Sequence, residues 1–294
     1  MGMMLLDSIA ELSANETHEI VSLVRDCSNI DFAPMLALRV QSFLDDLHPS
    51  TRIMRVRRDG RLVGAGLVNL GGSATPGCII AVAPGYRLRG LGSEILQSVR
   101  NQVIGGEIRV WNHGDCKSGF DFAKVHGMKI LQQLHLMEFE NSSNAYPAHT
   151  EPRLDFTIRV VDSSSLPMNW NQVVNESYRS PTVAMELAAR LWWSESKIVV
   201  AETSDGLCAG LLVLRDIVYK GVKSIENHLM AVDPTVRGLG IGRNLTTASL
   251  VFAREASRGY SISYVDRRNA AAVQAHVNAG FSTVSSDSVF SYSW

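Results

Sequence analysis

Two glycine-rich stretches with the same layout constrain this fold more than any other feature of the sequence. One reads VAPGYRLRGLGSEIL at residues 82–96, and the other reads VDPTVRGLGIGRNLT at residues 232–246. Each follows a run typical of a strand and opens a run whose apolar residues recur at helical spacing. Such internal repetition predicts two copies of one structural unit along the chain.

The segments around the two stretches follow the same order in both halves. Asp59-Gly60 and Asp205-Gly206 each separate two apolar or alternating runs and predict β-hairpins. After each hairpin we expect a strand, the glycine stretch with its helix, another strand, a short helix and a closing strand. The short helices are expected at residues 120–125 and 269–279, and the closing strands at 129–140 and 282–294. This order predicts an α/β (α+β) fold in which each half is a mostly antiparallel, splayed sheet flanked by helices.

The segment Glu140 to Arg153 separates the two halves. It is polar and twice interrupted by proline, a composition typical of a linker. We therefore predict an N-terminal domain over residues 1–147 and a C-terminal domain over residues 148–294. A chain of 294 residues is long enough for two such domains.

The composition limits the classes of partner. Apolar residues make up 46% of the chain, charged residues 19%, and the formal net charge is −1, which is typical of a soluble globular protein and argues against a nucleic-acid partner. The N-terminal residues lack the basic flank of a signal peptide, and no apolar run is long enough to span a bilayer. We expect a cytoplasmic monomer or homodimer without a membrane partner. The cysteines, expected to be reduced buried thiols, are Cys27, Cys78, Cys116 and Cys208.

The glycine stretches suit a phosphate cradle. The first N–H groups of a helix lack partners inside the helix, and the helix dipole adds positive potential there. The dinucleotide pattern GxGxxG fails, because the sixth position is Ile95 from Gly90 and Arg243 from Gly238, and the Gly-Lys-Ser/Thr of a nucleotide P-loop is absent. A tight turn without a ligand is the alternative for either stretch.

Both stretches fit Arg-x-x-Gly-x-Gly, which resembles the acetyl-coenzyme A signature of the GNAT N-acetyltransferases. The resemblance implies that acetyl-CoA is the cofactor, that the loop binds its pyrophosphate, and that a bulged strand before the loop pairs with its pantetheine. The implied cofactor-binding residues of the first half are Ile80, Val82, Arg87, Leu88, Arg89, Gly90, Leu91, Gly92 and Ser93. Those of the second half are Met230, Ala231, Val232, Arg237, Gly238, Leu239, Gly240, Ile241, Gly242, Arg243 and Asn269.

Acetyl transfer to an amine needs a deprotonated amine, hydrogen-bond donors for the oxyanion and a proton for the leaving thiolate. Regular alternation along residues 224–232 would place Glu226, His228, Met230 and Val232 on the face that meets the cofactor. Glu226 is then a candidate base, acting through water or with a raised pKa, and family members with glutamate at this spacing use it so. His228 competes for that role. Alternatively, Glu226 is a solvated or salt-bridged carboxylate.

The segment from Asn269 to Phe281 resembles the family's last motif, with His276 where a tyrosine is usual. An imidazole can protonate a thiolate, so His276 is a candidate acid. The alternative is an ordinary histidine on the helix surface beside Val273 and Val277. Asn269 either caps the helix or contacts the cofactor.

The matching positions of the first half are Pro76 and Ala123, neither of which can move a proton. We therefore predict that the C-terminal half performs transfer. The N-terminal half is expected to be degenerate and to retain a cofactor-shaped pocket.

Residues 110–139 resemble the first half of the mycothiol synthases, tandem GNAT enzymes that acetylate the cysteinyl amine of a pseudodisaccharide. The likeness depends on Trp111, His113, Gly114, Asp115 and Gly127. His276 and Arg215 depart from that family where an acceptor would lie. We therefore expect an acetyl-CoA-dependent N-acetyltransferase acting on a primary amine of a small molecule. The alternatives are antibiotic-type acetylation, as of an aminoglycoside, and a non-catalytic acyl-CoA sensor.

Three further groups of residues have structural and functional interpretations. His113, Asp115 and Cys116 predict a hydrogen-bonded turn, and we expect no metal site. Trp192-Trp193 are expected to anchor a helix, with the acceptor cleft as the alternative. A set of arginines predicts either a charged edge that deters sheet pairing or a site for an anionic group: Arg52, Arg55, Arg57, Arg58 and Arg61.

Overall fold

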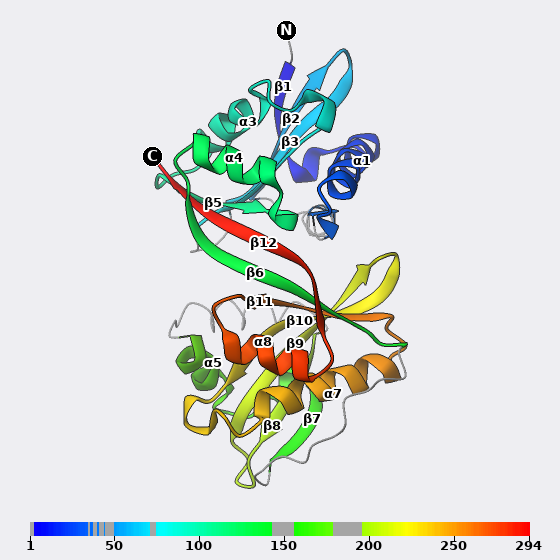
Figure 1. The fold of residues 1–294 in the computed structure, drawn as a ribbon, viewed down its shortest axis with the longest axis vertical. Coiled ribbons are helices and arrows are strands. Elements are labelled where there is room, and N and C mark those ends of the chain that lie inside the picture. Colours follow the sequence, from blue (N-terminus) through cyan, green and yellow to red (C-terminus); the bar gives the residue numbers. More distant parts are fainter. Residues whose placement is uncertain are drawn as a thin grey trace. The chain divides into compact units, whose positions relative to one another are not determined.

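A computed structural model describes residues 3–34, 36–37, 40, 44, 50–70, 75–142, 156–178 and 196–294. The chain forms two compact units, which we call unit 1 (Met1–Leu134 with Ser285–Trp294) and unit 2 (His135–Val284). Each unit is a mostly antiparallel sheet with helices on both faces (Figure 1). No helix among the described residues is long and apolar enough to cross a membrane.

Among the helices whose bounds the structure describes, unit 1 has one on one face of its sheet and two on the other (Figure 1). Its strands follow the order β1 (Met3–Ser8), β2 (Thr51–Arg58), β3 (Arg61–Asn69), β4 (Gly77–Val82), β5 (Glu107–Asn112) and β12 (Ser282–Ser293). Its helices are α1 (Ala14–Ile30), α3 (Leu91–Arg100) and α4 (Lys117–Val125), with 3-10 turns at Ile9–Glu11, Pro84–Tyr86 and His113–Asp115. Apolar residues of α1 fill one core, and those of α3 and α4 fill the other.

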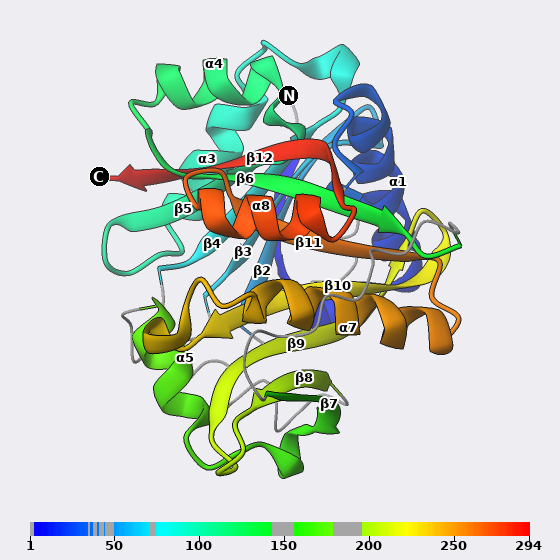
Figure 2. The ribbon, with the colours of Figure 1, turned by 60° about the horizontal axis from the view of Figure 1, so that its bottom comes forward.

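Unit 2 repeats this plan, and Figure 2 shows α7 and α8 together on one side of its strands. Its strands follow the order β6 (Lys129–Glu140, from His135), β11 (Tyr260–Asp266), β10 (Val222–Val232), β9 (Cys208–Tyr219), β8 (Lys197–Glu202) and β7 (Thr157–Asp162). Its helices are α5 (Trp170–Tyr178), α7 (Ile241–Glu255) and α8 (Ala270–Asn278), with 3-10 turns at Ser163–Ser165 and Pro234–Val236. Helix α5 packs on the opposite face from α7.

Both predicted hairpins are confirmed. Asp59 and Gly60 join β2 to β3 with φ of +50° and +76°, as a type I′ turn requires. The turn at Asp205-Gly206 joins β8 to β9, with Gly206 at φ +82°. A third hairpin, joining β9 to β10 at Lys220-Gly221, was not predicted from the sequence.

The closing strand of each half contributes to the unit built by the other half. Strand β12 pairs with β5 over Ser288–Ser293, and residues His135–Glu140 of β6 belong to unit 2 with β11. The compact units therefore differ from the domains 1–147 and 148–294 predicted above, because a repeat in sequence follows chain order and strand pairing need not. The predicted boundary lies within residues 143–155, outside the described residues, and stays a prediction.

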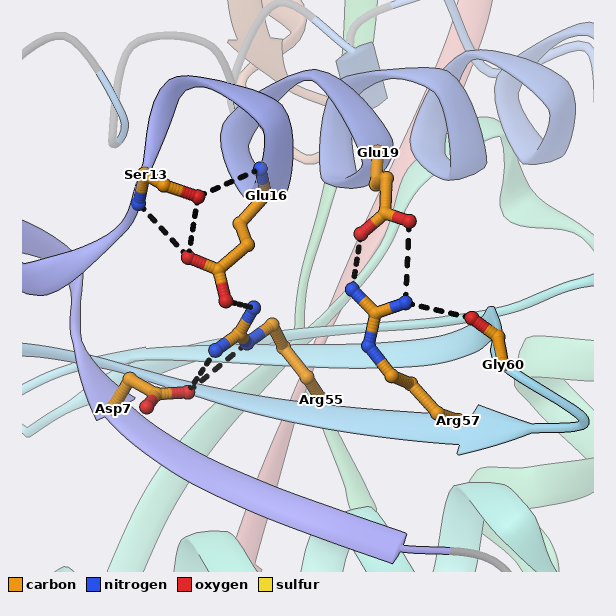
Figure 3. Close-up of polar contacts among 7 residues, drawn as sticks. All are labelled: Asp7, Ser13, Glu16, Glu19, Arg55, Arg57 and Gly60. Carbon is orange, nitrogen blue, oxygen red and sulfur yellow. Dashed lines mark hydrogen bonds and ion pairs between the residues drawn. The ribbon is translucent and has the colours of Figure 1, made fainter.

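A buried arginine joins the first three elements of unit 1 (Figure 3). Arg55 of β2 is 3% exposed and binds Asp7 Oδ2 at 2.7 Å through Nη2 and Glu16 through Nη1. Ser13 and Glu16 form the capping box that begins α1. Arg57 pairs with Glu19 of the same helix. The charged-edge interpretation of these two arginines is wrong, because β1 covers β2 and acidic residues neutralise both guanidinium groups.

We expect Arg55→Met to lower the free energy of unfolding by about 2–3 kcal/mol, because two carboxylates lose charged hydrogen bonds that tie α1 and β1 to the sheet. Urea unfolding measures this loss. The control is Arg61→Met at an exposed position of the same hairpin, for which we expect a change within about 0.5 kcal/mol. Equal losses in both variants would contradict the role of Arg55.

The same cluster gives a pH dependence. Hydrogen bonds from Ser13, and then from Arg55, lower the pKa of Glu16 from 4.5 to about 2. A carboxyl with a depressed folded pKa stabilises the fold above its unfolded pKa, and the contribution disappears as the pH falls from about 4.5 to about 2. The stability difference between wild type and Glu16→Gln should therefore be present at pH 6 and shrink steadily below pH 4.5. A constant difference across this range would contradict the assignment.

Candidate active site

The sheet of unit 2 splays beside the second glycine stretch, as predicted. Strands β10 and β11 run parallel and pair at Ile225–Ser261, Glu226–Ile262 and Asn227–Ser263 only, although β10 continues to Val232 and β11 to Asp266. Beyond Asn227 this side of β10 therefore has backbone groups that no described strand pairs. Such an edge can accept an extended ligand as an added strand.

A β-bulge interrupts β10 within the predicted site. Its register with β9 shifts between Asn227 and Leu229, so His228 has no partner in the ladder. Ile225 packs on the α7 side, and so do Met230 and Val232, because the extra residue inverts the alternation. The prediction that Glu226 shares a face with Met230 and Val232 is therefore wrong. Neighbouring residues of a strand point to opposite faces, and since Ile225 faces α7, Glu226 faces α5.

Glu226 is a buried carboxylate beside Arg215 and His228. It is 3% exposed, its Oε2 lies 3.9 Å from Arg215 Nη1, and its Oε1 lies 3.7 Å from His228 Nδ1. Arg215 is its cross-strand partner on β9. The alternative interpretation of Glu226 as a solvated carboxylate is therefore wrong, and its interpretation as an ion-paired carboxylate agrees with the structure. Both separations exceed a direct hydrogen bond, which suits proton transfer through a water molecule.

The second glycine stretch forms an open backbone cradle at the start of α7. Gly240 is the N-cap residue at φ +86°, and the first helical bond runs from Asn244 N to Gly240 O at 3.0 Å. Among the described residues, no atom lies within 4 Å of a Cβ built on Gly238 or Gly240. Because the first N–H groups of a helix lack partners inside the helix, this open loop fits a pyrophosphate.

The carbonyl groups of Met230 and Val232 point toward the splay. Asp233 N donates to Ala209 O of the neighbouring β9 segment at 2.9 Å, so the backbone groups of residue 233 point toward β9. Because successive residues of a strand direct their backbone groups to opposite sides, the carbonyls of residues 232 and 230 point away from β9. There Val232 O accepts from Arg237 Nε at 3.4 Å, and Met230 O accepts from Tyr178 Oη at 2.9 Å. These are the backbone positions predicted to face pantetheine, and this edge fits it.

The signature arginines brace the loops from within the protein. Arg87 donates to Val82 O at 2.9 Å and forms a bidentate pair with Asp31 at 2.7 Å, which raises its pKa. Arg237 donates to Val232 O and to Ser177 Oγ, the latter at 3.2 Å. Both side chains thus tie a strand end to a neighbouring helix, and their predicted contact with the cofactor stays a prediction.

Unit 1 has the same frame without the acid–base groups. Its β4 and β5 pair in parallel only at Gly77–Arg109 and Cys78–Val110, and Gly90 is the left-handed N-cap residue of α3. The register of β4 with β3 runs without a shift from Gly77 to Val82, so the bulge expected from the family resemblance is absent there. Among the described residues, Gly90 is as open as Gly240, whereas the Phe122 ring lies 3.1 Å from a Cβ built on Gly92 and Met230 Sδ lies 3.4 Å from one built on the equivalent Gly242.

His276 is buried, so its interpretation as a surface histidine is wrong. The side chain is 3% exposed and packs against Phe281, and burial lowers its pKa. Its Nδ1 lies 2.9 Å from Ala272 O, and because a carbonyl only accepts, Nδ1 carries the proton of the neutral ring. Nε2 of the neutral ring can therefore only accept a proton, and the one ring proton, on Nδ1, is bound to Ala272 O. This geometry does not favour the predicted role of His276 as the acid.

The structure places the other predicted site residues in structural roles. Asn269 Oδ1 accepts from Ala272 N at 3.1 Å and caps α8, while its contact with the cofactor stays a prediction. His113 Nδ1 lies 2.7 Å from Asp287 Oδ2, and Asp287 Oδ1 accepts from Gly114 N at 2.8 Å, so the predicted hydrogen-bonded turn is confirmed. Trp192-Trp193 lie outside the described residues.

The cysteines are free, and the prediction of buried thiols holds for Cys27, Cys78 and Cys208 and is wrong for Cys116, which is partly exposed. No cluster of three or more potential metal ligands occurs in the described part of the chain.

Two family models match this chain. The model described as "Acetyltransferase (GNAT) family" matches residues 17–113, and that described as "Acetyltransferase (GNAT) domain" matches residues 194–283, together more than half of the chain. Proteins named mycothiol acetyltransferase are similar over nearly the whole length. That of Salinispora tropica is 28% identical and covers 92% of this chain and 91% of its own, and that of Sanguibacter keddieii is 24% identical, with 94% and 93%.

Solved structures share the fold. A GCN5-related N-acetyltransferase from Sphaerobacter thermophilus superposes with a TM-score of 0.77 at 15% identity and covers 99% of this chain and 95% of its own. A tandem GNAT protein from the clavulanic acid biosynthesis pathway gives 0.73 at 15% identity, with coverage of 100% and 98%. At this identity the likeness shows a common architecture.

Proposed function

Because the chain belongs to the GNAT acetyltransferases and contains two of their domains in tandem, we propose that unit 2 transfers an acetyl group from acetyl-CoA to a primary amine of a small molecule. The observation that carries this proposal is the buried Glu226 at a bulged, splayed strand that leads into an open glycine cradle. Unit 1 has the cradle and the splay, but neither the bulge nor a carboxylate at this place.

Acetyl-CoA supplies the activated acyl group when it is bound. The first-turn N–H groups of α7 would hold the pyrophosphate, and the edge of β10 at Met230 and Val232 would pair with the pantetheine. The bulge takes the His228 peptide out of the β9 ladder and makes its N–H available for the oxyanion. Glu226 accepts the proton of the attacking amine through water, and Arg215 stabilises its negative charge.

The charges beside Glu226 favour one acceptor class over another. Arg215 lies beside the carboxylate, and this cation disfavours a polycationic aminoglycoside. It is compatible with an acceptor that has a single amine. We therefore propose a cysteinyl amine on a sugar-containing thiol precursor, the acceptor suggested by the relatives named mycothiol acetyltransferase.

The test follows thiol release from acetyl-CoA across a set of amines that includes cysteinyl glycosides, free amino acids and aminoglycosides. The proposal expects turnover with the cysteinyl glycosides and at least about 100-fold lower kcat/KM with aminoglycosides. Turnover confined to aminoglycosides would support the antibiotic-type alternative. Tight CoA binding without turnover of any amine would support a sensor.

A further inference from the structure

The last residue pair before the sheet of unit 2 splays is polar. Asn227 of β10 and Ser263 of β11 form the final rung of the parallel ladder. Asn227 is 4% exposed, and neither Oδ1 nor Nδ2 of its side chain has a hydrogen-bond partner among the described residues. An unpaired buried amide costs free energy, so native proteins normally supply a partner from water or a ligand. The side chain of Asn227 therefore needs a partner that the described part of the chain does not supply.

Both side chains of this pair lie on the face of the sheet that carries α7 and α8. Ile225 packs on the α7 side, and Asn227, two residues further along β10, shares its face. Val265 packs against α8, and Ser263 shares its face in the same way. Ser263 Oγ donates to the backbone carbonyl of Asn227 at 3.4 Å, which leaves the hydroxyl oxygen as an acceptor. Donor and acceptor groups thus gather on the face that also carries the glycine cradle.

Unit 1 has an apolar pair at the equivalent place. Its β4 and β5 end their parallel ladder at Cys78 and Val110, which belong to the buried core beneath α3. Counted back from Val82 and from Val232 along the ladder with the preceding strand, and with the bulge allowed for, Cys78 corresponds to Asn227. The fold of such a unit therefore does not require polar groups at this rung, and a ligand is a physical reason for their presence in unit 2.

The proposed cofactor would bring its acyl group to this pair. The pantetheine would run along the edge of β10 from Val232 to Met230, and its thioester arm would continue toward Asn227, since a strand advances only about 3.3 Å per residue. We infer that unit 2 also transfers short acyl groups that end in a hydroxyl, such as hydroxyacetyl, and that Asn227 selects them. This inference rests on the proposed function.

The hydrogen-bonding capacity of the pair favours a hydroxyl over other acyl ends. A hydroxyl can accept from Asn227 Nδ2 and donate to Ser263 Oγ. A methyl group would leave the amide unpaired, and a carboxylate would face the lone pairs of Asn227 Oδ1 and Ser263 Oγ. Acetyl remains a substrate on this proposal, because it ends one heavy atom short of the hydroxyl and a water molecule can then meet the amide.

Hydroxyacetyl transfer follows the same bond changes as acetyl transfer. The amine nitrogen bonds to the acyl carbonyl carbon, and the carbon–sulfur bond breaks with its electron pair on sulfur. The proton of the nitrogen passes to Glu226 and then through solvent to the sulfur, so the products are an amide and CoA. The hydroxyl of the acyl group takes no part in these changes, and Asn227 acts on the choice of donor alone.

Two acyl-CoA donors of equal size test this inference in the wild-type protein. Hydroxyacetyl-CoA has a hydroxyl where propionyl-CoA has a methyl group. When both are offered together with the amine that acetyl-CoA acylates fastest, the ratio of the two amides measures the ratio of kcat/KM. Wild type should favour the hydroxyacetyl product by at least about 10-fold. Equal products, or more of the propionyl product, would overturn the inference and leave the proposed function standing. Failure of every donor to acylate any amine would instead overturn the proposed function.

Variants test the assignment to Asn227. Asn227→Leu keeps a similar size without a polar atom and should lower the product ratio to about one or reverse it. Calorimetry of the two donors without an amine gives a readout apart from turnover, and the variant should lose the preference there as well. The matched control is Asn278→Leu, which removes an exposed amide from α8 and should keep the wild-type ratio. Asn227→Cys, with the side chain that unit 1 has at this place, serves if the leucine variant fails to fold. A folded variant at position 227 that keeps the wild-type preference would overturn the assignment.

Discussion

Replacing Glu226 with glutamine is expected to lower kcat/KM for the acceptor amine by about 10²–10⁴-fold, the usual contribution of a positioned general base. The amide keeps the size of the side chain and its place beside Arg215 and His228 but cannot take a proton. Affinity for CoA should stay unchanged, because Glu226 faces the α5 side of β10 and the cofactor edge is formed by the backbone of Met230 and Val232. Steady-state kinetics and calorimetry on the same preparation separate the two quantities.

The matched control is Glu202→Gln. Glu202 lies on β8, which β9 separates from β10, and its carboxylate pairs with Arg159 at 2.6 Å. Replacing this carboxylate should therefore leave kcat/KM within about twofold of wild type. A loss below about threefold in Glu226→Gln would exclude this carboxylate as the base. His228, whose Nδ1 lies 3.7 Å away, would then be tested by His228→Asn.

Gly240→Asp should weaken cofactor binding in unit 2, raising the Kd of CoA by roughly 100-fold through like-charge repulsion. The new carboxylate would stand at the N-cap of α7, directly beside the N–H groups that we propose hold the pyrophosphate. At φ +86° any residue with a Cβ strains the backbone, although no atom of the described residues lies within 4 Å of a Cβ at this position. Thermal unfolding measures how much stability this strain costs, and Gly90→Asp carries the same strain in unit 1.

Gly90→Asp is the equivalent change in unit 1, since Gly90 is also a left-handed N-cap residue, at φ +83°, with open space around its Cβ. We expect this variant to keep full transferase activity. If transfer survived Gly240→Asp and was lost in Gly90→Asp, the roles of the two units would be reversed. The binding stoichiometry in both variants also shows whether the cradle of unit 1 takes CoA.

The repeat itself was readable from the sequence because its signals are local. An Asp-Gly pair turns a hairpin through its own backbone preferences, and a glycine at the start of a helix takes positive φ wherever it stands. Both hairpins, both glycine loops and the helices behind them follow from such signals. The capping box at Ser13 and Glu16 is an equally local signal that could have predicted α1.

The side chains of the site depended on contacts between distant segments. One extra residue at His228 inverts the alternation of β10, and a bulge of this kind has no reliable mark in the sequence. His276 lies on a helix of polar and apolar residues, and only packing against Phe281 shows that it is buried. Tyr178 stands 52 residues before its acceptor, so nothing in the sequence around either residue indicates their bond.

By itself the sequence determined a chain with two copies of a strand, a glycine loop and a helix, together with the ligand class that such loops accept, because these depend on backbone conformation over a few residues. The tertiary structure decided which side chains reach the splay of unit 2 and which half supplies the closing strand of each unit. Those outcomes depend on register and packing between segments far apart in the chain, which local preference cannot specify.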